Sequence, residues 1–318
     1  MILVTGGLGF IGLHAARGLL DLGEKVVLTQ YQVPRMPDFI KDEVDKRAFI
    51  EQLDVTDGDR VLAICRKHAV DGIVHMVSPD SDLGSAGYYR IVMTGLLNVL
   101  EAGRLCGVKR LTVASSQTTY TGVKEGPFRE DMPLRTTANN PGEAFKKSME
   151  ILSHYYGQRE ALDVVAMRIG AIYGPLYHSM GHLVSRMVHA AVEGTEVAVR
   201  GGFGQGAGDV YAGDGGDMCY AKDCGRGIAL LQTAAKLEHR CYNIGSGRPT
   251  ANAEVLAAIQ GIVPGFRMNL KDGTGPSFRA NAYMDISRIQ AETDYRPDFL
   301  IDKAVPDYVA WLREGNAQ

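Results

Sequence analysis

The sequence is poor in cysteine and has no long apolar run. It contains five cysteines among 318 residues, and no two of them form a C-x-x-C pair. An odd number without such a pair is typical of reduced thiols rather than of a disulfide framework. No apolar stretch approaches the length of a membrane span. A first strand starting at Ile2 leaves no room for a cleaved signal peptide, so we expect a cytoplasmic protein.

An excess of either charge is also absent. The chain has 34 Lys and Arg against 37 Asp and Glu, a net charge of −3. This balance gives no broad attraction for nucleic acid or for an anionic membrane, and we expect neither as a partner. Hydrophobic residues make up 45% and charged residues 22%, as in soluble globular proteins. The length allows one large domain or two modest ones.

The N-terminus carries the most informative pattern. An apolar run over residues 2–4 leads into a glycine-rich turn, then an amphipathic helix that stops at Gly23, then a second strand at residues 26–28. This order is the context that a dinucleotide-binding fingerprint requires. The glycines let the backbone approach the pyrophosphate, and the helix N-terminus attracts phosphate groups. The residues expected to contact the cofactor are Gly6, Gly9, Phe10, Ile11 and Gly12.

The end of the second strand leaves the choice of cofactor open. An acidic residue here would bind the adenosine ribose of NAD, but the strand ends in Thr29-Gln30 and no carboxylate follows until Asp38. Gln30 can bond the ribose hydroxyl, whereas Arg35 can bind a 2′-phosphate. We therefore expect NAD or NADP.

Strands and helices then alternate along the chain. Further strands are expected near residues 53–57, 73–77, 111–114 and 164–168. One helix is expected to begin at an Asp57 cap and to run through His68. Two others are expected over about 87–106 and about 143–160. This alternation predicts an α/β protein with a doubly wound parallel Rossmann sheet.

Several segments resemble those of extended short-chain dehydrogenase/reductases of the NAD-dependent epimerase/dehydratase family. The resemblance covers nearly the whole chain and implies that Asp54 and Val55 contact the cofactor. It implies a dinucleotide-binding domain over residues 1–168 with 217–243, and a smaller C-terminal substrate-binding region over 169–216 with 244–318. The glycine-dense stretch 201–216 fits either a crossover between the two or a surface loop. The segments that carry the resemblance are 5–12, 54–57, 107–110, 114–116, 168–175, 217–223, 242–247 and 285–287.

The resemblance also implies a catalytic centre, which is incomplete in this chain. In the family a serine or threonine after the fifth strand acts with Tyr-x-x-x-Lys on the next helix. The lysine holds the nicotinamide ribose and lowers the tyrosine pKa, and the tyrosine moves the proton. Ser116 and Lys146 match, but Gly142 stands in the tyrosine position and Val92 replaces a helper asparagine. Another group is therefore expected to move the proton.

The replacement candidates each have an ordinary alternative. Glu143 can act as a base or be a first-turn glutamate favoured by the helix dipole. Tyr120 can transfer a proton or be a packing residue. His178 and His182 can bind a metal if helical, but no third ligand is evident and we predict no metal site. His75 is expected to be a core residue with a hydrogen-bond partner.

The substrate side departs from the family as well. Members that bind nucleotide sugars usually carry an arginine just before the aspartate equivalent to Asp217, and this chain has Gly216 there. A smaller polyol, acyl or aromatic substrate is therefore about as compatible with this sequence as a nucleotide sugar. The remaining candidates for anion contacts are Arg186, Arg200, Arg267 and Arg279.

Two functions from different classes remain. The first is an NAD(P)-binding enzyme acting on a hydroxyl- or carbonyl-bearing small molecule by oxidoreduction, epimerisation or an elimination or aldol-type step. The second is a non-catalytic sensor that binds a dinucleotide, and the retention of Ser116 and Lys146 favours the enzyme. The resemblance also implies a homodimer through a four-helix bundle of the two long helices. The outward apolar residues expected there are Leu97, Leu100, Ile151, Leu152 and Tyr155.

Overall fold

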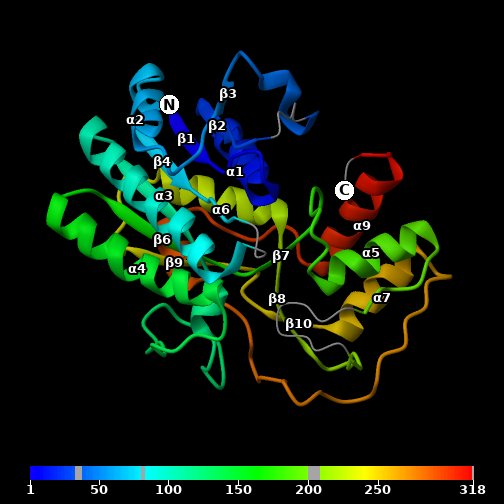
Figure 1. The fold of residues 1–318 in the computed structure, drawn as a ribbon. Coiled ribbons are helices and arrows are strands. Elements are labelled where there is room, and N and C mark those ends of the chain that lie inside the picture. The colour runs from blue at the N-terminus through cyan, green and yellow to red at the C-terminus, as the bar shows by residue number, and fades with distance from the viewer. Residues whose placement is uncertain (33–37, 80–82, 200–207, 317–318) are drawn as a thin grey trace.

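The computed structural model describes residues 1–32, 38–79, 83–199 and 208–316. A seven-stranded sheet forms its centre, in the order β3-β2-β1-β4-β5-β6-β9, and every pairing in it is parallel (Figure 1). The predicted doubly wound Rossmann sheet is confirmed. Its strands are β1 (Ile2–Thr5), β2 (Val26–Gln30), β3 (Ala48–Gln52), β4 (Gly72–His75), β5 (Arg110–Ser116), β6 (Val164–Ile169) and β9 (Cys241–Ile244).

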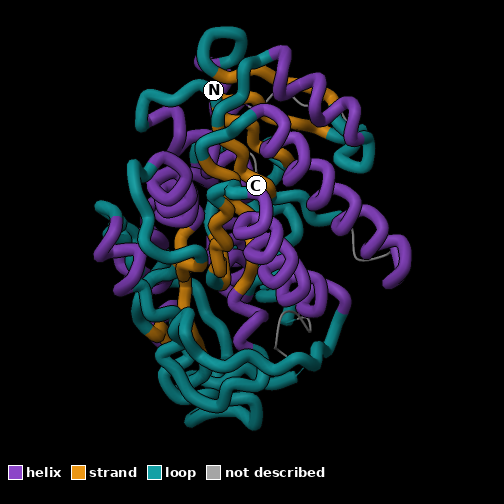
Figure 2. The backbone as a smooth tube through the Cα atoms, turned by 90° about the vertical axis from the view of Figure 1, so that its left-hand side faces the viewer, coloured by secondary structure: helices purple, strands orange, loops and turns teal. Residues whose placement is uncertain are grey.

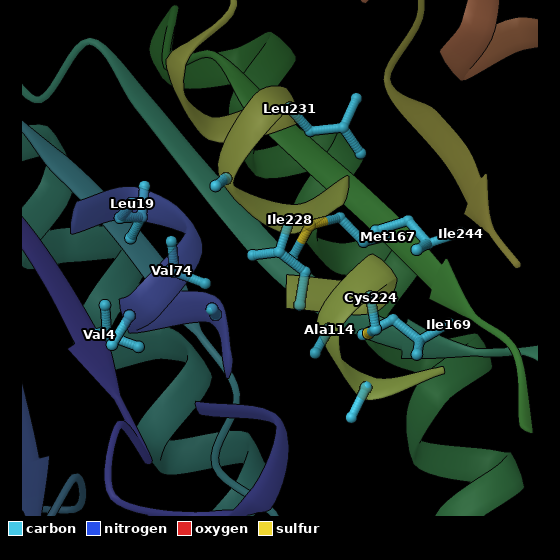
Figure 3. Close-up of a cluster of buried hydrophobic side chains, with 14 of the residues drawn as sticks. Val4, Leu19, Val74, Ala114, Met167, Ile169, Cys224, Ile228, Leu231 and Ile244 are labelled. Carbon is cyan, nitrogen blue, oxygen red and sulfur yellow. The ribbon is translucent and has the colours of Figure 1, made fainter. Parts of the chain in front are cut away.

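Helices cover both faces of this sheet because alternate strand residues point to opposite sides. Val4 belongs to a core shared with α1 and α6, whereas Leu3 belongs to a core shared with α2, α3 and α4. Figure 3 shows the first core, in which Leu19 and Ile228 lie beside strand residues. The helices are α1 (Phe10–Asp21), α2 (Gly58–Lys67), α3 (Gly84–Cys106), α4 (Pro141–Glu160) and α6 (Ala221–Thr233).

Helices α1 and α6 approach each other very closely. A β carbon at Gly18 would lie 2.7 Å from the Gly225 carbonyl oxygen, and one at Gly225 would lie 2.2 Å from the His14 carbonyl oxygen. Both distances are shorter than any real contact, so only glycine fits at these two positions. The two helix backbones are therefore in direct contact.

A smaller sheet of three strands lies beside the main one, in the order β10-β8-β7. Three helices pack on it around a separate apolar core (Figures 1 and 2). Strand β8 belongs to this sheet, although the expected boundary at residue 217 assigns most of it to the dinucleotide-binding unit. The elements are β7 (Ala171–Tyr173), β8 (Gly215–Tyr220), β10 (Pro249–Ala251), α5 (Leu183–Glu193), α7 (Asn252–Ile262) and α9 (Ile301–Arg313), and the short α8 (Ser287–Glu292) packs against β9.

The element boundaries follow from local capping. The third strand, expected to end within residues 53–57, ends at Gln52 as β3, and residues 53–57 form a loop. In that loop the Asp54 carboxylate accepts the Thr56 N–H at 2.9 Å, and Asp57 caps α2 by accepting the Arg60 N–H at 2.9 Å. Side chains that bond the nearby backbone in this way favour turns and helix starts over strands.

Helix α4 begins at Pro141 because the Asn140 side chain caps it, accepting the Glu143 N–H at 2.9 Å. Proline is favourable at the first helical position. Among the described residues, no helix is both long and apolar enough to cross a membrane.

Candidate functional site

The glycine turn after β1 has the shape of a phosphate cradle. Gly6 adopts a φ of +72°, a conformation that other residues rarely adopt. A β carbon at Gly12 would lie 2.3 Å from the Gly6 carbonyl oxygen, so the turn closes only with glycine there. Gly9 is the N-cap of α1 and makes no side-chain cap bond, so no capping side chain covers the helix N-terminus. These residues fit a pyrophosphate group.

The cradle lies where the strand order of the sheet reverses. Strand β1 is flanked by β2 and β4, and ligands of such sheets bind beyond the carboxyl ends of the strands at this point. The Gly6 N–H donates to the Thr29 hydroxyl at 3.2 Å, and a β carbon at Gly6 would lie 3.3 Å from the backbone of Met76, which follows β4. Phe10 stacks on Tyr177 with ring centroids 4.7 Å apart.

The other predicted cofactor residues lie at the same edge of the sheet. Gln30 ends β2 and is half-buried, whereas Arg35 lies outside the described residues. Asp54 is exposed, and its carboxylate also accepts the Thr56 hydroxyl at 2.7 Å. Val55 is buried, and its carbonyl accepts the Asn98 side-chain amide at 2.8 Å.

Ser116 and the Lys146 ammonium both lie near the end of β5. The Ser116 hydroxyl accepts the Thr118 N–H at 3.1 Å and so starts a short 3₁₀ helix. The Lys146 ammonium donates to the carbonyl oxygen of Ala114, two residues before Ser116. Burial lowers the pKa of Lys146 to about 8. The structure thus brings together the two residues that match the family.

Gly142 lies one helical turn before Lys146 and offers no side chain there. A β carbon at this position would have Asn140 Oδ1 at 3.3 Å and the Tyr88 hydroxyl at 3.7 Å as its nearest neighbours. Tyr88 was not among the residues that the sequence pattern singles out. Its only sequence signal is a pair of tyrosines, Tyr88 and Tyr89, near the start of the long helix α3.

Glu143 forms a buried ion pair. Its carboxylate lies 2.7 Å from the Lys147 ammonium and accepts the Asn139 N–H at 3.1 Å. Only 2% of the side chain is exposed. Both contacts engage the carboxylate within α4 and the segment just before it, so the geometry disfavours Glu143 as the replacement base.

Tyr120 lies in the core, and its hydroxyl is fully engaged. It donates to Asn243 Oδ1 at 2.8 Å and accepts a bond from Arg168 at 2.9 Å. Its ring stacks on Phe128 at 5.2 Å, and burial raises the pKa of the phenol. These contacts are those of a packing residue and argue against Tyr120 as a proton-transfer group.

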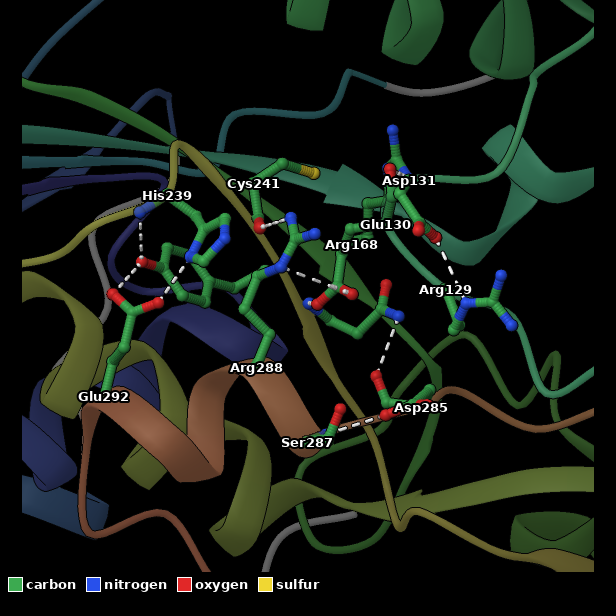
Figure 4. A network of polar contacts seen from close by, with 12 residues as sticks. Arg129, Glu130, Asp131, Arg168, His239, Cys241, Asp285, Ser287, Arg288 and Glu292 are labelled. Atoms are coloured by element: carbon green, nitrogen blue, oxygen red, sulfur yellow. Dashed lines mark hydrogen bonds and ion pairs between the residues drawn. The ribbon is translucent and has the colours of Figure 1, made fainter.

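Arg168 is the centre of a buried polar network. Its guanidinium binds both oxygens of Glu150, with a shortest distance of 2.7 Å, and donates to the Glu130 carbonyl at 3.2 Å. Figure 4 shows how Glu130 in turn lies near Arg288, 3.8 Å away. The network fastens the loop before α4 and the segment around α8 to the edge of the main sheet.

The histidines show no metal-binding arrangement. His178 is exposed and outside any helix, and His182 is the N-cap of α5 and stacks on Tyr173 at 5.9 Å. No group of three or more potential metal ligands occurs within the part of the chain that the structure describes. His75 is buried and hydrogen-bonded to Thr5 at 2.7 Å, as expected, and burial lowers its pKa to about 3.

The candidate arginines are held by local carbonyl or ring contacts. Arg186 is buried and donates to the Met180 carbonyl at 3.2 Å, and Arg267 donates to the Phe266 carbonyl at 2.8 Å. Arg279 lies over the Phe128 ring at 5.0 Å. Arg200 and residues 201–207 of the glycine-dense stretch lie outside the described residues.

A glycine cradle at the switch point of a parallel sheet defines a Rossmann-type dinucleotide-binding protein. The chain belongs to the NAD dependent epimerase/dehydratase family, which it matches over residues 2–245. This membership confirms the resemblance to extended short-chain dehydrogenase/reductases and the predicted class of NAD-dependent enzyme.

Similar proteins span nearly the same length. A UDP-glucose 4-epimerase of Lacticaseibacillus casei is 28% identical, with 81% of this chain and 80% of the relative covered. A dTDP-glucose 4,6-dehydratase of an Actinoplanes species is 26% identical, with 98% and 97% covered. The solved UDP-glucose 4-epimerase of Thermus thermophilus, in complex with NAD, has a TM-score of 0.74 at 26% identity, with 98% of each chain covered.

Proposed function

We propose that this chain is an NAD-dependent enzyme that oxidises or reduces a carbon bearing a hydroxyl or carbonyl group in a sugar-like molecule. The observation that carries the proposal is the glycine cradle at the switch point with Ser116 and Lys146 on the same edge of the sheet. The relatives act on nucleotide sugars by epimerisation or dehydration, which supports a sugar-like substrate.

The proposed roles follow from position. Backbone N–H groups at Phe10 and Ile11 bind the pyrophosphate beside Gly9, and Gln30 bonds the adenosine ribose, with Asp54 and Val55 lining the same edge. Lys146 holds the nicotinamide ribose, and Ser116 polarises the substrate oxygen. When bound, the nicotinamide supplies or accepts a hydride. The NAD complex of the Thermus thermophilus relative supports NAD over NADP.

The substrate is proposed to be smaller than a nucleotide sugar. Gly216 offers no side chain for a diphosphate, and a β carbon there would lie 3.1 Å from the Ala282 carbonyl oxygen. The proposed substrate-binding unit consists of the smaller sheet with α5, α7 and α9. A free sugar or polyol needs no diphosphate contact, so its binding is compatible with glycine at this position.

We expect saturating NAD to raise the melting temperature of the wild-type protein. A ligand at a hundredfold excess over Kd stabilises the folded state by about 2.7 kcal/mol. The protein loaded with NAD should then gain the absorbance of reduced nicotinamide when mixed with glucose, sorbitol or UDP-glucose.

The thermal shift and the absorbance together distinguish an enzyme from a non-catalytic sensor. An enzyme gives both the thermal shift and the absorbance with at least one compound of a broad polyol and sugar panel. A thermal shift without any reduction across the panel favours the sensor, which retains the cradle but lacks proton transfer. If neither NAD nor NADP changes the melting temperature, the proposed cofactor site is wrong.

We further propose a homodimer formed by α3 and α4. Three apolar side chains on these helices are strongly exposed: Leu97 at 51%, Ile151 at 70% and Tyr155 at 66%. Leu152 is exposed at 37%, whereas Leu100 is fully buried, so the expectation that Leu100 faces outward is wrong. Large exposed apolar side chains gathered on neighbouring helices mark an interaction surface.

Light scattering of the wild-type protein at micromolar concentration should give the mass of a dimer. Replacing Ile151 with aspartate places a charge in the contact and should give a monomer. Leu22, which is exposed at the end of α1, provides the matched control, because Leu22→Asp should leave the dimer intact. A monomeric wild type would contradict the proposal.

A further inference from the structure

Tyr88 is a nearly buried tyrosine that the proposed function does not use. Its ring packs edge-on against Phe145 of α4, with centroids 6.3 Å apart, and only 7% of the residue is exposed. The ring belongs to the core between α3 and α4, while the hydroxyl points toward the start of α4. Buried tyrosine hydroxyls usually have a polar partner or a ligand.

The Tyr88 hydroxyl lies beside the position that the family tyrosine should occupy. It is 3.7 Å from the place where a β carbon of residue 142 would be. Residue 142 is one turn from Lys146, about 6 Å along the helix axis. Glycine at 142 thus removes the family phenol from the start of α4, and α3 brings another phenol to the same helix start.

A second contact places the hydroxyl on the ligand side of the sheet. The Ser78 side chain hydrogen-bonds to the Tyr88 phenol. Ser78 comes three residues after the end of β4, two residues beyond the Met76 backbone that lies against Gly6 of the cradle. The Tyr88 hydroxyl therefore lies between the loop beside the cradle and the helix that carries Lys146.

The other candidate groups near this edge already have strong partners. Glu143 pairs with Lys147, the Tyr120 hydroxyl binds Arg168, and His75 binds Thr5. Among the described residues Tyr88 is hydrogen-bonded to Ser78, a neutral side chain, so its proton can be exchanged at that contact without breaking an ion pair.

We propose that the Tyr88 phenol is the proton-transfer group of the reaction, in place of the tyrosine that is absent at position 142. This inference rests on the proposed function. The O–H bond of the substrate alcohol breaks, and its proton passes to the phenolate oxygen of Tyr88. A hydride passes to NAD from the carbon that bears this oxygen, so NAD is reduced as the alcohol becomes a carbonyl. The exposed Ser78 hydroxyl connects Tyr88 with solvent, so that the proton is released between turnovers.

The groups around Tyr88 shift its pKa in both directions. Burial raises the pKa of Tyr88, the Ser78 side chain lowers it and the neighbouring Tyr89 raises it further. A positive charge close to the phenol favours the phenolate. The oxidised nicotinamide ring carries such a charge and the reduced ring does not.

The first experiment needs no substrate. The ionisation of Tyr88 is measured as the difference in ultraviolet absorbance between wild type and Tyr88→Phe over a pH titration. NAD should lower the apparent pKa of this one phenol, and NADH should lower it less. An unchanged titration in a protein whose melting temperature NAD does raise would overturn the proposal while leaving the cofactor site intact.

The second experiment measures the reduction of bound NAD by the compound that gives the largest signal with wild type. Tyr88→Phe should slow this reduction about 10²–10⁴-fold, the contribution of a positioned acid or base. Tyr89→Phe, on the same helix, should react like wild type. The double variant Tyr88→Phe with Gly142→Tyr should recover part of the loss, because it returns a phenol to the family position.

Unchanged NAD binding in Tyr88→Phe would exclude a folding defect as the cause of the lower rate. If Tyr88→Phe reduces NAD at the wild-type rate, Tyr88 is a packing residue and the proposal is wrong. If no compound is reduced by wild type, the proposed function fails, and the titration with NAD still decides whether Tyr88 lies at the cofactor.

Discussion

Replacing Gly9 with valine should abolish the stabilisation of this protein by NAD. Gly9 is the N-cap of α1, and a β carbon there already lies 3.2 Å from the Gly6 carbonyl oxygen. The two methyl groups of valine would then extend outward over the helix N-terminus, where the pyrophosphate must bind. The loss should equal the whole ligand-linked stabilisation, about 2.7 kcal/mol at a hundredfold excess of NAD over Kd.

Thermal unfolding with and without NAD measures this effect directly. Gly261→Val is the matched control, because a β carbon at Gly261 in α7 meets no other atom within 4 Å. The control should lose a little intrinsic stability and keep the full NAD shift. A Gly9→Val protein that retains the wild-type shift would show that NAD binds elsewhere.

Replacing Glu150 with leucine should give the largest loss of stability of any single change considered. Glu150 is buried and binds the Arg168 guanidinium at 2.7 Å, and it also accepts a bond from the Ser115 hydroxyl. Without the carboxylate, Arg168 keeps its charge in a buried site with only neutral partners. Breaking a buried pair from one side costs about 3–5 kcal/mol.

Urea unfolding of the two proteins measures the difference in free energy. Asp131→Asn is the control, because the ion pair of Asp131 with Arg129 is exposed on both sides, and such a pair contributes about 1 kcal/mol or less. A Glu150→Leu protein as stable as the control would mean that solvent reaches Arg168 and that the network in Figure 4 does not hold the sheet edge.

The parts of the fold that the sequence predicts are those that depend on neighbouring residues. The alternation of strands and helices, the glycine turn and the Asp57 cap all involve residues a few positions apart. Their physical causes, periodic burial, positive φ and side-chain bonds to nearby N–H groups, act within one element. The assignment of β8 to a separate sheet depends on pairing with β7 and β10, which lie about 30 to 45 residues away, and no local pattern encodes it.

Some residues of the candidate site can likewise be predicted from the sequence, and others only from the fold. Ser116 and Lys146 follow from the resemblance to the family motif. The pairing of Glu143 with Lys147 is a contact between residues four apart on one helix, and helical spacing alone could have indicated it. The Tyr120 hydroxyl is hydrogen-bonded to Arg168 and Asn243, which come from distant strands. The sequence therefore could not show that this hydroxyl has buried partners. The approach of Tyr88 to Gly142 joins two helices across more than fifty residues, and only the packing of α3 on α4 reveals it.

The backbone contact between α1 and α6 determines which parts of the protein can move when a ligand enters. Helix α6 starts at Ala221, directly after β8 ends at Tyr220. The contact at Gly18 and Gly225 is made by backbone and β-carbon atoms, which cannot change rotamer, so we expect the phosphate cradle, α6 and the end of β8 to move as one unit. We expect any movement over a substrate to arise from α5, α7 and α9, and hydrogen exchange to be faster there than in α1.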